Sequence, residues 1–237
     1  IYQTTQFPDS STKYHNYYLL LRVGAYFGAC SHVPEQLGVD AAGELSGKAL
    51  KSCLTDPRLP VRIAAMDAYF GTVYPHESQC SEAVELPGGT PTEKAEFRDN
   101  LIADIAKVEQ GMKIALIGVV NPLIAAIRKR GGTCLPCDLQ MERTHWGDPV
   151  EKDMEKVLDS ADGVICTGMT LSNGTFDRVI ERVLERSIPL TVYAQTGSAV
   201  AARFVGAGIT SLVAEPFPFS QFSANATRVF CYRGQGD

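Results

Sequence analysis

The chain has 237 residues, of which 45% are hydrophobic and 21% charged, and its 22 basic and 27 acidic residues give a net charge of −5. These proportions are typical of a globular protein with one large domain or two modest ones. The acidic balance argues against nucleic acid as a partner, and no apolar run approaches the roughly 18 residues of a membrane span. Seven irregularly spaced cysteines and no visible secretory signal argue against a disulfide framework, so we expect a cytoplasmic protein.

Residues 1–92 predict a small α+β domain. Its expected elements are one or two strands within residues 14–31, broken near Gly24, and helices at residues 45–54 and 60–70. Gly71 is expected to end the second helix. Proline and glycine are frequent in residues 73–91, which we interpret as a linker or exposed loop.

Residues 93–237 predict a Rossmann-like domain. A helix over residues 92–110 comes first, with an apolar stripe at helical spacing and Gly111 as its stop. Strands and helices then alternate, with strands at 113–119, 133–137, 163–166, 189–194 and 211–214 and helices at 122–130, 150–158, 176–186 and 199–206. Such alternation implies right-handed crossovers and a parallel sheet with helices on both faces.

Ligands of open parallel sheets bind at the carboxyl ends of the strands, near the switch point of the strand order. Gly118 follows the first of these strands, and Asn121 is expected to cap the next helix. Asp138 follows the second strand, where a dinucleotide fold keeps its ribose-binding acid. Val120 and Leu123 replace the later glycines of the GxGxxG fingerprint, so NAD(P) is disfavoured as a cofactor.

The third strand leads into the most informative segment, residues 167–175. Seven of its nine residues are Thr, Ser, Asn or Gly, more than a turn requires. Hydroxyl, amide and backbone N–H groups are therefore expected to contact a ligand from Thr167, Gly168, Thr170, Asn173, Gly174 and Thr175. The alternative is a polar turn, capped by Thr175, that binds nothing.

The ends of the fourth and fifth strands repeat this chemistry on a smaller scale. Thr196, Gly197 and Ser198 follow the fourth strand, and Ser198 either caps the next helix or contacts the ligand. Glu215 follows the fifth strand and opens a rigid aromatic segment that suits a pocket wall. Both segments are expected to face residues 167–175 across the switch point.

The sequence motifs for a metal site and for a catalytic nucleophile are less specific than the segment at residues 167–175. Cys134 and Cys137 have CxxC spacing, with Asp138 and His145 nearby, but a structural zinc site commonly takes its four ligands from two such pairs. Buried thiols in a strand are the favoured interpretation. No histidine lies beside a nucleophile motif, so the sequence assigns no catalytic group and no metal ligand.

Residues 166–175 resemble the signature of a bacterial and archaeal family known as putative heavy-metal chelation proteins. Five further segments are similar to elements of that family in the same order, namely residues 43–50, 63–68, 117–123, 196–198 and 206–209. The resemblance covers most of residues 20–217. Asp67 stands where the family usually has Asn, and Met169 where it usually has Ser.

The resemblance implies two domains with a cleft between them. The first, over residues 1–92, would be similar to the N-terminal domain of enolases, and the second, over residues 93–237, would be an atypical Rossmann-like domain. It also implies a role in handling metals or metal-bearing small molecules, so a metal ion or a metal chelate is the expected cofactor or ligand.

Three hypotheses follow. The first is a protein that holds an anionic or metal-chelating ligand in the interdomain cleft, with the ligand's own atoms holding most of any metal. The second is an enzyme of metallophore or other specialised metabolism, a lyase, transferase or cyclase, with Asp67, Asp138 and Glu215 as acid/base groups. The third is a structural role in which residues 167–175 form only a cap. A homo-oligomer is compatible with each.

Overall fold

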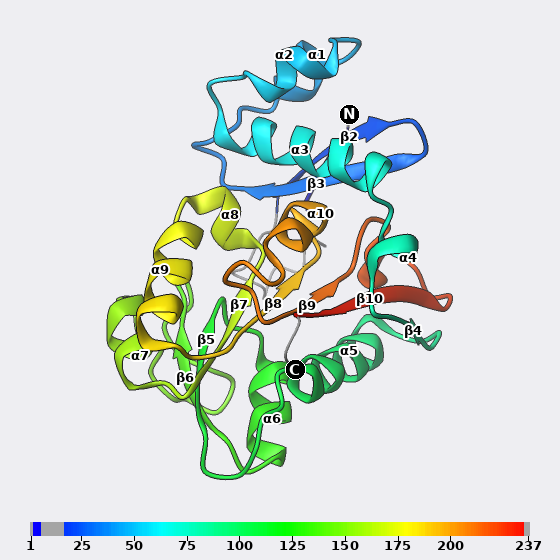
Figure 1. Ribbon diagram of the computed structural model, residues 1–237. Coiled ribbons are helices and arrows are strands. Elements are labelled where there is room, and N and C mark those ends of the chain that lie inside the picture. The colour runs from blue at the N-terminus through cyan, green and yellow to red at the C-terminus, as the bar shows by residue number, and fades with distance from the viewer. Residues whose placement is uncertain (1, 6–16, 235–237) are drawn as a thin grey trace.

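The computed structural model describes residues 2–5 and 17–234, and these form two sheets (Figure 1). The smaller sheet is antiparallel and consists of β1 (Tyr2–Thr5), β2 (Tyr17–Val23) and β3 (Tyr26–His32). The larger has seven strands in the order β4-β10-β9-β8-β7-β5-β6. Within the described residues, no helix has both the length and the apolar character to cross a membrane.

The N-terminal part is a β-hairpin covered by helix α3 (Leu59–Val73). The strands expected within residues 14–31 are present, and Gly24 forms the turn with φ of +59°. The single helix predicted at 45–54 was wrong. Two short helices, α1 (Ala41–Leu45) and α2 (Leu50–Leu54), take its place, because Gly47 adopts φ of +76° between them.

Two glycines let the hairpin and α3 approach closely. A Cβ on Gly28 of β3 would lie 2.1 Å from the Ala68 nitrogen and 2.3 Å from the Ala64 oxygen, both backbone atoms of α3. Gly71 does not end the helix as predicted, since α3 continues to Val73. A Cβ on Gly71 would lie 2.1 Å from the Tyr26 ring, so close packing explains this glycine.

The expected linker at 73–91 is largely structured. It contains helix α4 (His76–Gln79) and strand β4 (Glu82–Leu86). Strand β4 pairs antiparallel with β10 (Thr227–Arg233), a strand that the sequence analysis missed. Residues 82–86 therefore join the larger sheet, although they fall in the range predicted for the N-terminal domain.

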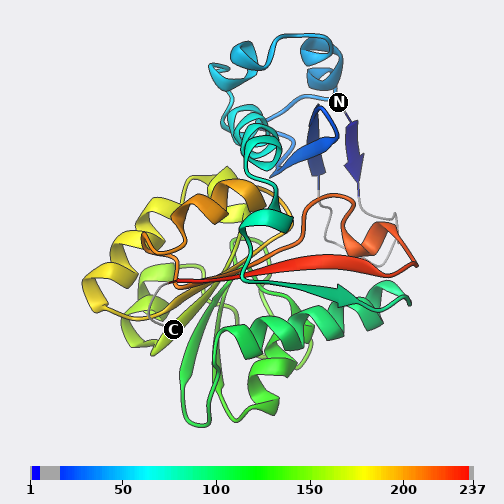
Figure 2. The ribbon, with the colours of Figure 1, turned by 45° about the vertical axis from the view of Figure 1, so that its right-hand side comes forward.

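The five predicted parallel strands are present and adjacent in the larger sheet. They are β5 (Lys113–Ile117), β6 (Thr133–Cys137), β7 (Gly163–Thr167), β8 (Leu190–Ala194) and β9 (Ser211–Ala214). Helices cover both faces (Figure 2). One face carries α5 (Pro91–Ile105) and α6 (Asn121–Lys129), and the other carries α7 (Met154–Ser160), α8 (Met169–Asn173), α9 (Phe176–Arg186) and α10 (Ser198–Ala201).

Local hydrogen bonds explain where several helix ends differ from the prediction. Helix α5 begins with a capping box between Thr90 and Glu93. Helix α7 starts four residues later than expected, because the Asp153 side chain caps it by accepting from the Glu155 N–H at 3.0 Å.

Helix α10 is short and passes into the 3₁₀ turn η1 (Ala202–Phe204), and a second turn, η2 (Ser220–Phe222), follows β9.

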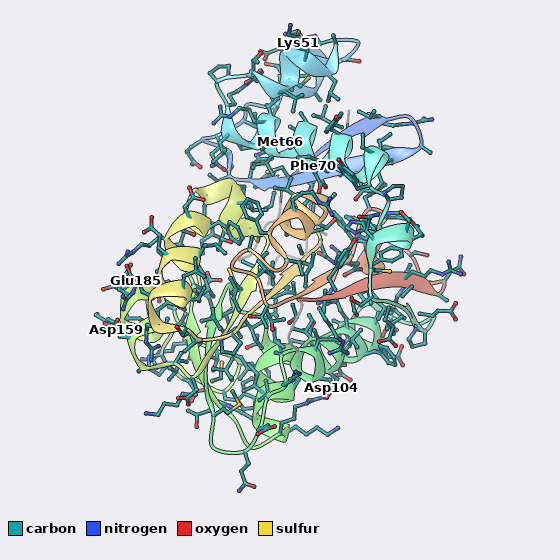
Figure 3. The ribbon with its side chains drawn as sticks, in the orientation of Figure 1. Lys51, Met66, Phe70, Asp104, Asp159 and Glu185 are labelled. Carbon is teal, nitrogen blue, oxygen red and sulfur yellow. The ribbon has the colours of Figure 1, made fainter. Side chains whose placement is uncertain are left out.

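Surface ion pairs connect neighbouring helices. Arg182 on α9 pairs with Asp159 on α7 and with Glu185 one turn along its own helix, and both acidic residues lie side by side in Figure 3. Asp104 on α5 pairs with Arg130 after α6 at 2.6 Å. Exposed pairs contribute about 0–1 kcal/mol each, so they adjust helix placement rather than dominate stability.

One apolar core runs through both parts of the chain. Leu19 and Ile63 of the N-terminal part belong to the same buried cluster as Val192 of the larger sheet. Backbone contacts reinforce this junction, since the Gly197 N–H donates to the Ala29 oxygen at 2.8 Å. The small sheet is therefore held firmly against the larger one.

We predict that Gly28→Ala destabilises the protein strongly, because the new methyl group would meet backbone atoms of α3 that cannot move aside. The expected loss is about 2–3 kcal/mol of unfolding free energy, measured by urea denaturation. The matched control is Gly43→Ala, at an exposed α1 position with no heavy atom within 4 Å of the new Cβ, which should gain up to about 1 kcal/mol. Equal effects of the two substitutions would contradict the close approach of β3 and α3.

Candidate functional site

A cleft of about 580 Å³ opens at the carboxyl edge of the parallel strands. Its lining comes from the segments that follow all five strands, and from β2, β3 and the residues after β3. Strands β6 and β7 lie on opposite sides of β5, so the connections that leave β5 and β7 diverge. The cleft therefore lies at the topological switch point of the sheet.

Part of the residue set predicted from the sequence lines this cleft. These residues are Gly118, Asp138, Thr167, Thr170, Asn173, Thr175 and Glu215. The remaining predicted residues are not among the lining residues, and they are Asn121, Gly168, Gly174, Thr196, Gly197 and Ser198. The side chains and backbone of the two groups make different contacts within the protein.

Within residues 167–175, where a loop was expected, Met169–Asn173 form a short helix, α8. The Thr170 hydroxyl is buried and donates to the Thr167 oxygen at 2.7 Å. At the exposed end of α8, Asn173 Oδ1 accepts from both the N–H and the hydroxyl of Thr175, at 3.1 and 2.7 Å. Thr175 does not cap α9 through its side chain, and Gly174 ends α8 with φ of +77°.

Two glycines pack the strand ends together. A Cβ on Gly118 would lie 2.3 Å from Thr167 Cγ2, and a Cβ on Gly168 would lie 2.5 Å from the Thr196 oxygen. The Gly118 carbonyl also accepts from the Tyr193 hydroxyl at 2.6 Å. Close approach between the β5, β7 and β8 ends therefore explains these glycines.

Asp138 organises the two loops beside the switch point. Its Oδ2 accepts from the Val119 N–H at 3.0 Å, and its Oδ1 accepts from the N–H groups of Gln140 and Met141 at 2.8 and 2.9 Å. The carboxylate thus joins the segment after β5 to the segment after β6. These three bonds occupy most of its acceptor capacity.

Asn121 was expected to cap α6, and that expectation was wrong. Val120 occupies the cap position, and Asn121 is the first residue of the helix. Its Oδ1 accepts from the His145 N–H at 2.9 Å and so holds the loop after β6.

The floor of the cleft is a buried ion triad. Glu215 is 2% exposed and lies 3.3 Å from Arg98 Nη1, while Arg98 Nε donates to Asp99 Oδ1 at 2.8 Å. Burial raises the pKa of Asp99. Burial opposes the charge of Arg98, but the two carboxylates outweigh it and raise the pKa of its guanidinium.

Arg98 was missed in the sequence analysis, although the sequence carried a signal. It precedes Ile102 by four residues and so lies on the apolar side of the predicted helix. A charged residue on that stripe requires a buried partner. The partner comes from the far end of the chain, which helical periodicity cannot identify.

The mouth of the cleft carries an exposed cation. Lys152 Nζ donates to the backbone oxygens of Asp138 and Met141 at 3.0 and 2.7 Å, and it forms no ion pair with any described residue. Glu155, also at the mouth, lies 2.6 Å from Arg178 and 3.1 Å from Arg182. Glu155 is therefore neutralised internally, whereas neither Lys152 nor the exposed Asp153 beside it forms an ion pair with a described residue.

The N-terminal wall comes from β2, β3 and the residues after β3. Gln36 spans the cleft edge, because its amide donates to the Ser172 oxygen at 2.9 Å. His32 is almost fully buried in this wall, and burial lowers its pKa, so the imidazole is neutral at pH 7. The sequence analysis did not select His32, because nothing local indicates that the end of β3 reaches the larger sheet.

Ser198 belongs to a second, buried cluster. Its hydroxyl lies 3.2 Å from His76 Nε2, and His76 Nδ1 lies 2.5 Å from the Tyr232 hydroxyl. The imidazole stacks on Phe230 with ring centroids 5.4 Å apart. Burial lowers the pKa of His76 to about 4. These residues do not line the cleft.

Asp67, considered as an acid/base group, also lies outside the cleft lining. Its two oxygens accept from the N–H groups of Ala29 and Ala199, at 2.8 and 2.7 Å. Burial raises the pKa of Asp67 to about 7, and those backbone donors oppose the rise. Asp67 therefore joins α3, β3 and the start of α10.

The cysteines do not form a metal site. Cys134 and Cys137 lie three residues apart in β6, so their side chains point to opposite faces of the sheet and pack in different cores. All seven thiols are free. Among the described residues, no three His, Cys, Asp or Glu side chains are arranged to hold a metal ion. The described side chains therefore do not fit a protein-held heavy metal.

We predict that His76 makes stability depend on pH. An unfolded histidine has a pKa near 6.5 and the folded one about 4, so its contribution is complete above pH 6.5 and is lost as the pH falls toward 4. The contribution of His76 to the slope should approach about 1.4 kcal/mol per pH unit, with the raised pKa of Asp67 opposing it in the same range, and His76→Gln should remove the His76 contribution from the total. Urea denaturation at pH 7.5 and 5 measures the difference, with exposed His145→Gln as the control. An unchanged slope in His76→Gln would contradict the assignment.

Comparison with known proteins finds one family model that matches part of the chain. Residues 100–210 match the family model DUF364, described as "putative heavy-metal chelation". Among curated proteins, none matches the chain.

Two solved structures of that family, both of unknown function, resemble the chain. The protein from Desulfitobacterium hafniense DCB-2 has a TM-score of 0.58 and 16% identity, over 84% of this chain and 74% of that one. The protein from Pyrococcus horikoshii has a TM-score of 0.57 and 13% identity, over 92% and 89%. At these identities the likeness establishes the fold alone. The resemblance to the putative heavy-metal chelation family, expected from residues 166–175, is thus confirmed by the match over residues 100–210.

Proposed function

We propose that the protein binds a small organic ligand with anionic or metal-chelating oxygen atoms in the cleft at the carboxyl edge of the sheet. One observation carries this proposal. The carboxylates of Asp138 and Glu155 are committed to partners within the protein and Asp153 accepts one backbone N–H, whereas several hydrogen-bond donors of the cleft lining remain open.

The committed acceptors are Asp138 and Glu155. Asp138 accepts three backbone N–H groups, and Glu155 is paired with Arg178 and Arg182. A ligand cation that bound to Asp138 or Glu155 would have to displace these partners. Displacing an internal hydrogen bond leaves its donor unpaired, which costs about 1–3 kcal/mol when the donor is buried.

The uncommitted donors come from three elements. Lys152 uses two of its three ammonium protons on backbone oxygens, and Asn173 makes no hydrogen bond through Nδ2 with any described residue. Thr167 Oγ1 accepts from the Met169 N–H at 3.4 Å, and its own proton has no acceptor among the described residues. All three residues line the cleft. This donor set favours a carboxylate, phenolate or other oxygen-rich group.

A metal in this cleft would arrive bound to the ligand. The described side chains offer no set of three metal ligands, while the donors at the mouth suit the oxygen atoms of a chelator. The family description fits a role in handling such chelates. We therefore favour binding of an organic chelate over direct chelation by the protein.

An enzyme using the same cleft is the alternative, and His32 is the observation that favours it. A histidine acts as a general base in its neutral form, and burial lowers the pKa of His32, which lines the cleft, and so favours that form at pH 7. Of the carboxylates considered for acid/base work, Asp67 does not line the cleft, and Asp138 and Glu215 each accept three hydrogen bonds from within the protein. Binding needs none of these groups to exchange a proton.

Calorimetric titration tests the proposal with 2,3-dihydroxybenzoate, its ferric complex, and Zn²⁺ alone. We predict binding of the free chelator or its ferric complex and no binding of Zn²⁺. Lys152→Met and Asn173→Ala should each weaken binding roughly tenfold, as expected for loss of one hydrogen bond to a charged group.

The matched control is Lys156→Met, which removes an exposed lysine of α7 outside the cleft lining. It should leave the affinity unchanged. Absence of binding by both the chelator and its ferric complex, or equal losses in Lys152→Met and Lys156→Met, would overturn the proposal.

A further inference from the structure

We infer that Arg98 and Glu215, at the floor of the cleft, recognise a neutral group that carries a hydrogen-bond acceptor beside a donor, as in a lactam or urea edge. This inference rests on the proposed function, because it concerns the inner end of the same ligand. The oxygen-rich end would meet Lys152 and Asn173 at the mouth.

Exposure separates the floor from the mouth. The side chains of Arg98 and Glu215 are 14% and 2% exposed, and both line the cleft. Lys152 and Asn173 are exposed. A ligand long enough to reach the floor therefore meets two chemically different ends.

Arg98 offers a donor to the cleft. Its Nε donates to Asp99 and its Nη1 to Glu215, but its Nη2 makes no hydrogen bond with any described residue. This Nη2 is not among the fully buried atoms without a partner, so it is open to the space that Arg98 lines. A guanidinium has five N–H groups, and three of them remain uncommitted.

Glu215 offers an acceptor next to that donor. Its Oε2 accepts from Arg98 Nη1 at 3.3 Å and from Gln195 Nε2 at 2.9 Å, and its Oε1 accepts from the Ser220 N–H. A carboxylate has about four acceptor positions, so one remains. The 3.3 Å contact between Arg98 Nη1 and Glu215 Oε2 places the guanidinium and the carboxylate side by side.

The charge of the floor favours a neutral partner. Asp99, Arg98 and Glu215 carry one excess negative charge when both carboxylates are ionised, so the net charge of the triad disfavours an added anion. An added cation that approaches Glu215 meets Arg98 beside it. A neutral acceptor–donor edge satisfies both groups without adding charge.

Amide and apolar side chains surround this pair. Gln195 and Gln221 hydrogen-bond to each other through their side-chain amides, at 2.8 and 3.2 Å, which orients the Gln195 donor to Glu215. Ile102 and Val213 line the cleft with Arg98 and Glu215, and they are apolar. A site of this kind rejects a ligand that leaves one of its buried polar groups unpaired.

Four ring compounds of similar size test the inference on the wild-type protein by ligand-observed NMR. They are 2-pyridone, which carries the acceptor beside the donor, N-methyl-2-pyridone, which lacks the donor, benzoate and benzamidine. We predict that 2-pyridone binds at least tenfold more tightly than each of the other three. Tighter binding of benzoate or benzamidine would overturn the inference and leave the proposed function standing.

A variant pair adds a second measurement. Glu215→Gln should weaken 2-pyridone at least tenfold, whereas Glu185→Gln, on the outer surface of α9 and outside the cleft lining, should leave it unchanged. Absence of 2-pyridone binding to the wild-type protein would also overturn the inference. The dihydroxybenzoate titration then decides separately whether the cleft binds a ligand at its mouth.

Discussion

The cleft depends on one buried carboxylate that joins the two parts of the chain. Asp67 of α3 accepts from Ala29 of β3 and from Ala199 of α10, so it holds the small sheet against the segment that follows β8. Ser31 and His32, which line the cleft, come two and three residues after Ala29. Without this junction, the carboxyl ends of the five parallel strands would have no second wall opposite them, and there would be no cleft.

Polar groups around the cleft divide into those that build it and those left open. The Asp138 carboxylate accepts hydrogen bonds from two loops, and Gly118 and Gly168 allow the ends of neighbouring strands to approach one another. Lys152, Asn173 and one face of Arg98 remain available. An acidic protein thereby presents a donor-rich cleft. Its carboxylates are mostly occupied by internal donors, and this preorganisation lowers the cost of binding.

The sequence predicted the part of this arrangement that depends on local patterns. Alternating apolar segments predicted all five parallel strands, and the switch-point rule indicated where to look for a site. Contacts between distant segments were not predictable. Nothing local pairs Arg98 with Glu215, 117 residues away, or turns Ser198 toward His76 rather than into the cleft. Strands β4 and β10 were missed because they pair antiparallel with each other across a long stretch of sequence, outside the alternation of strands and helices.

The central claim is that the ligand, rather than the protein, holds any metal in this cleft. A crystal structure of the protein with ferric dihydroxybenzoate, with the iron located by anomalous scattering, tests it most directly. The account predicts an iron peak in the cleft near Lys152 and Asn173, coordinated by chelator oxygens alone. Iron coordinated by protein side chains, or located outside the cleft, would contradict it.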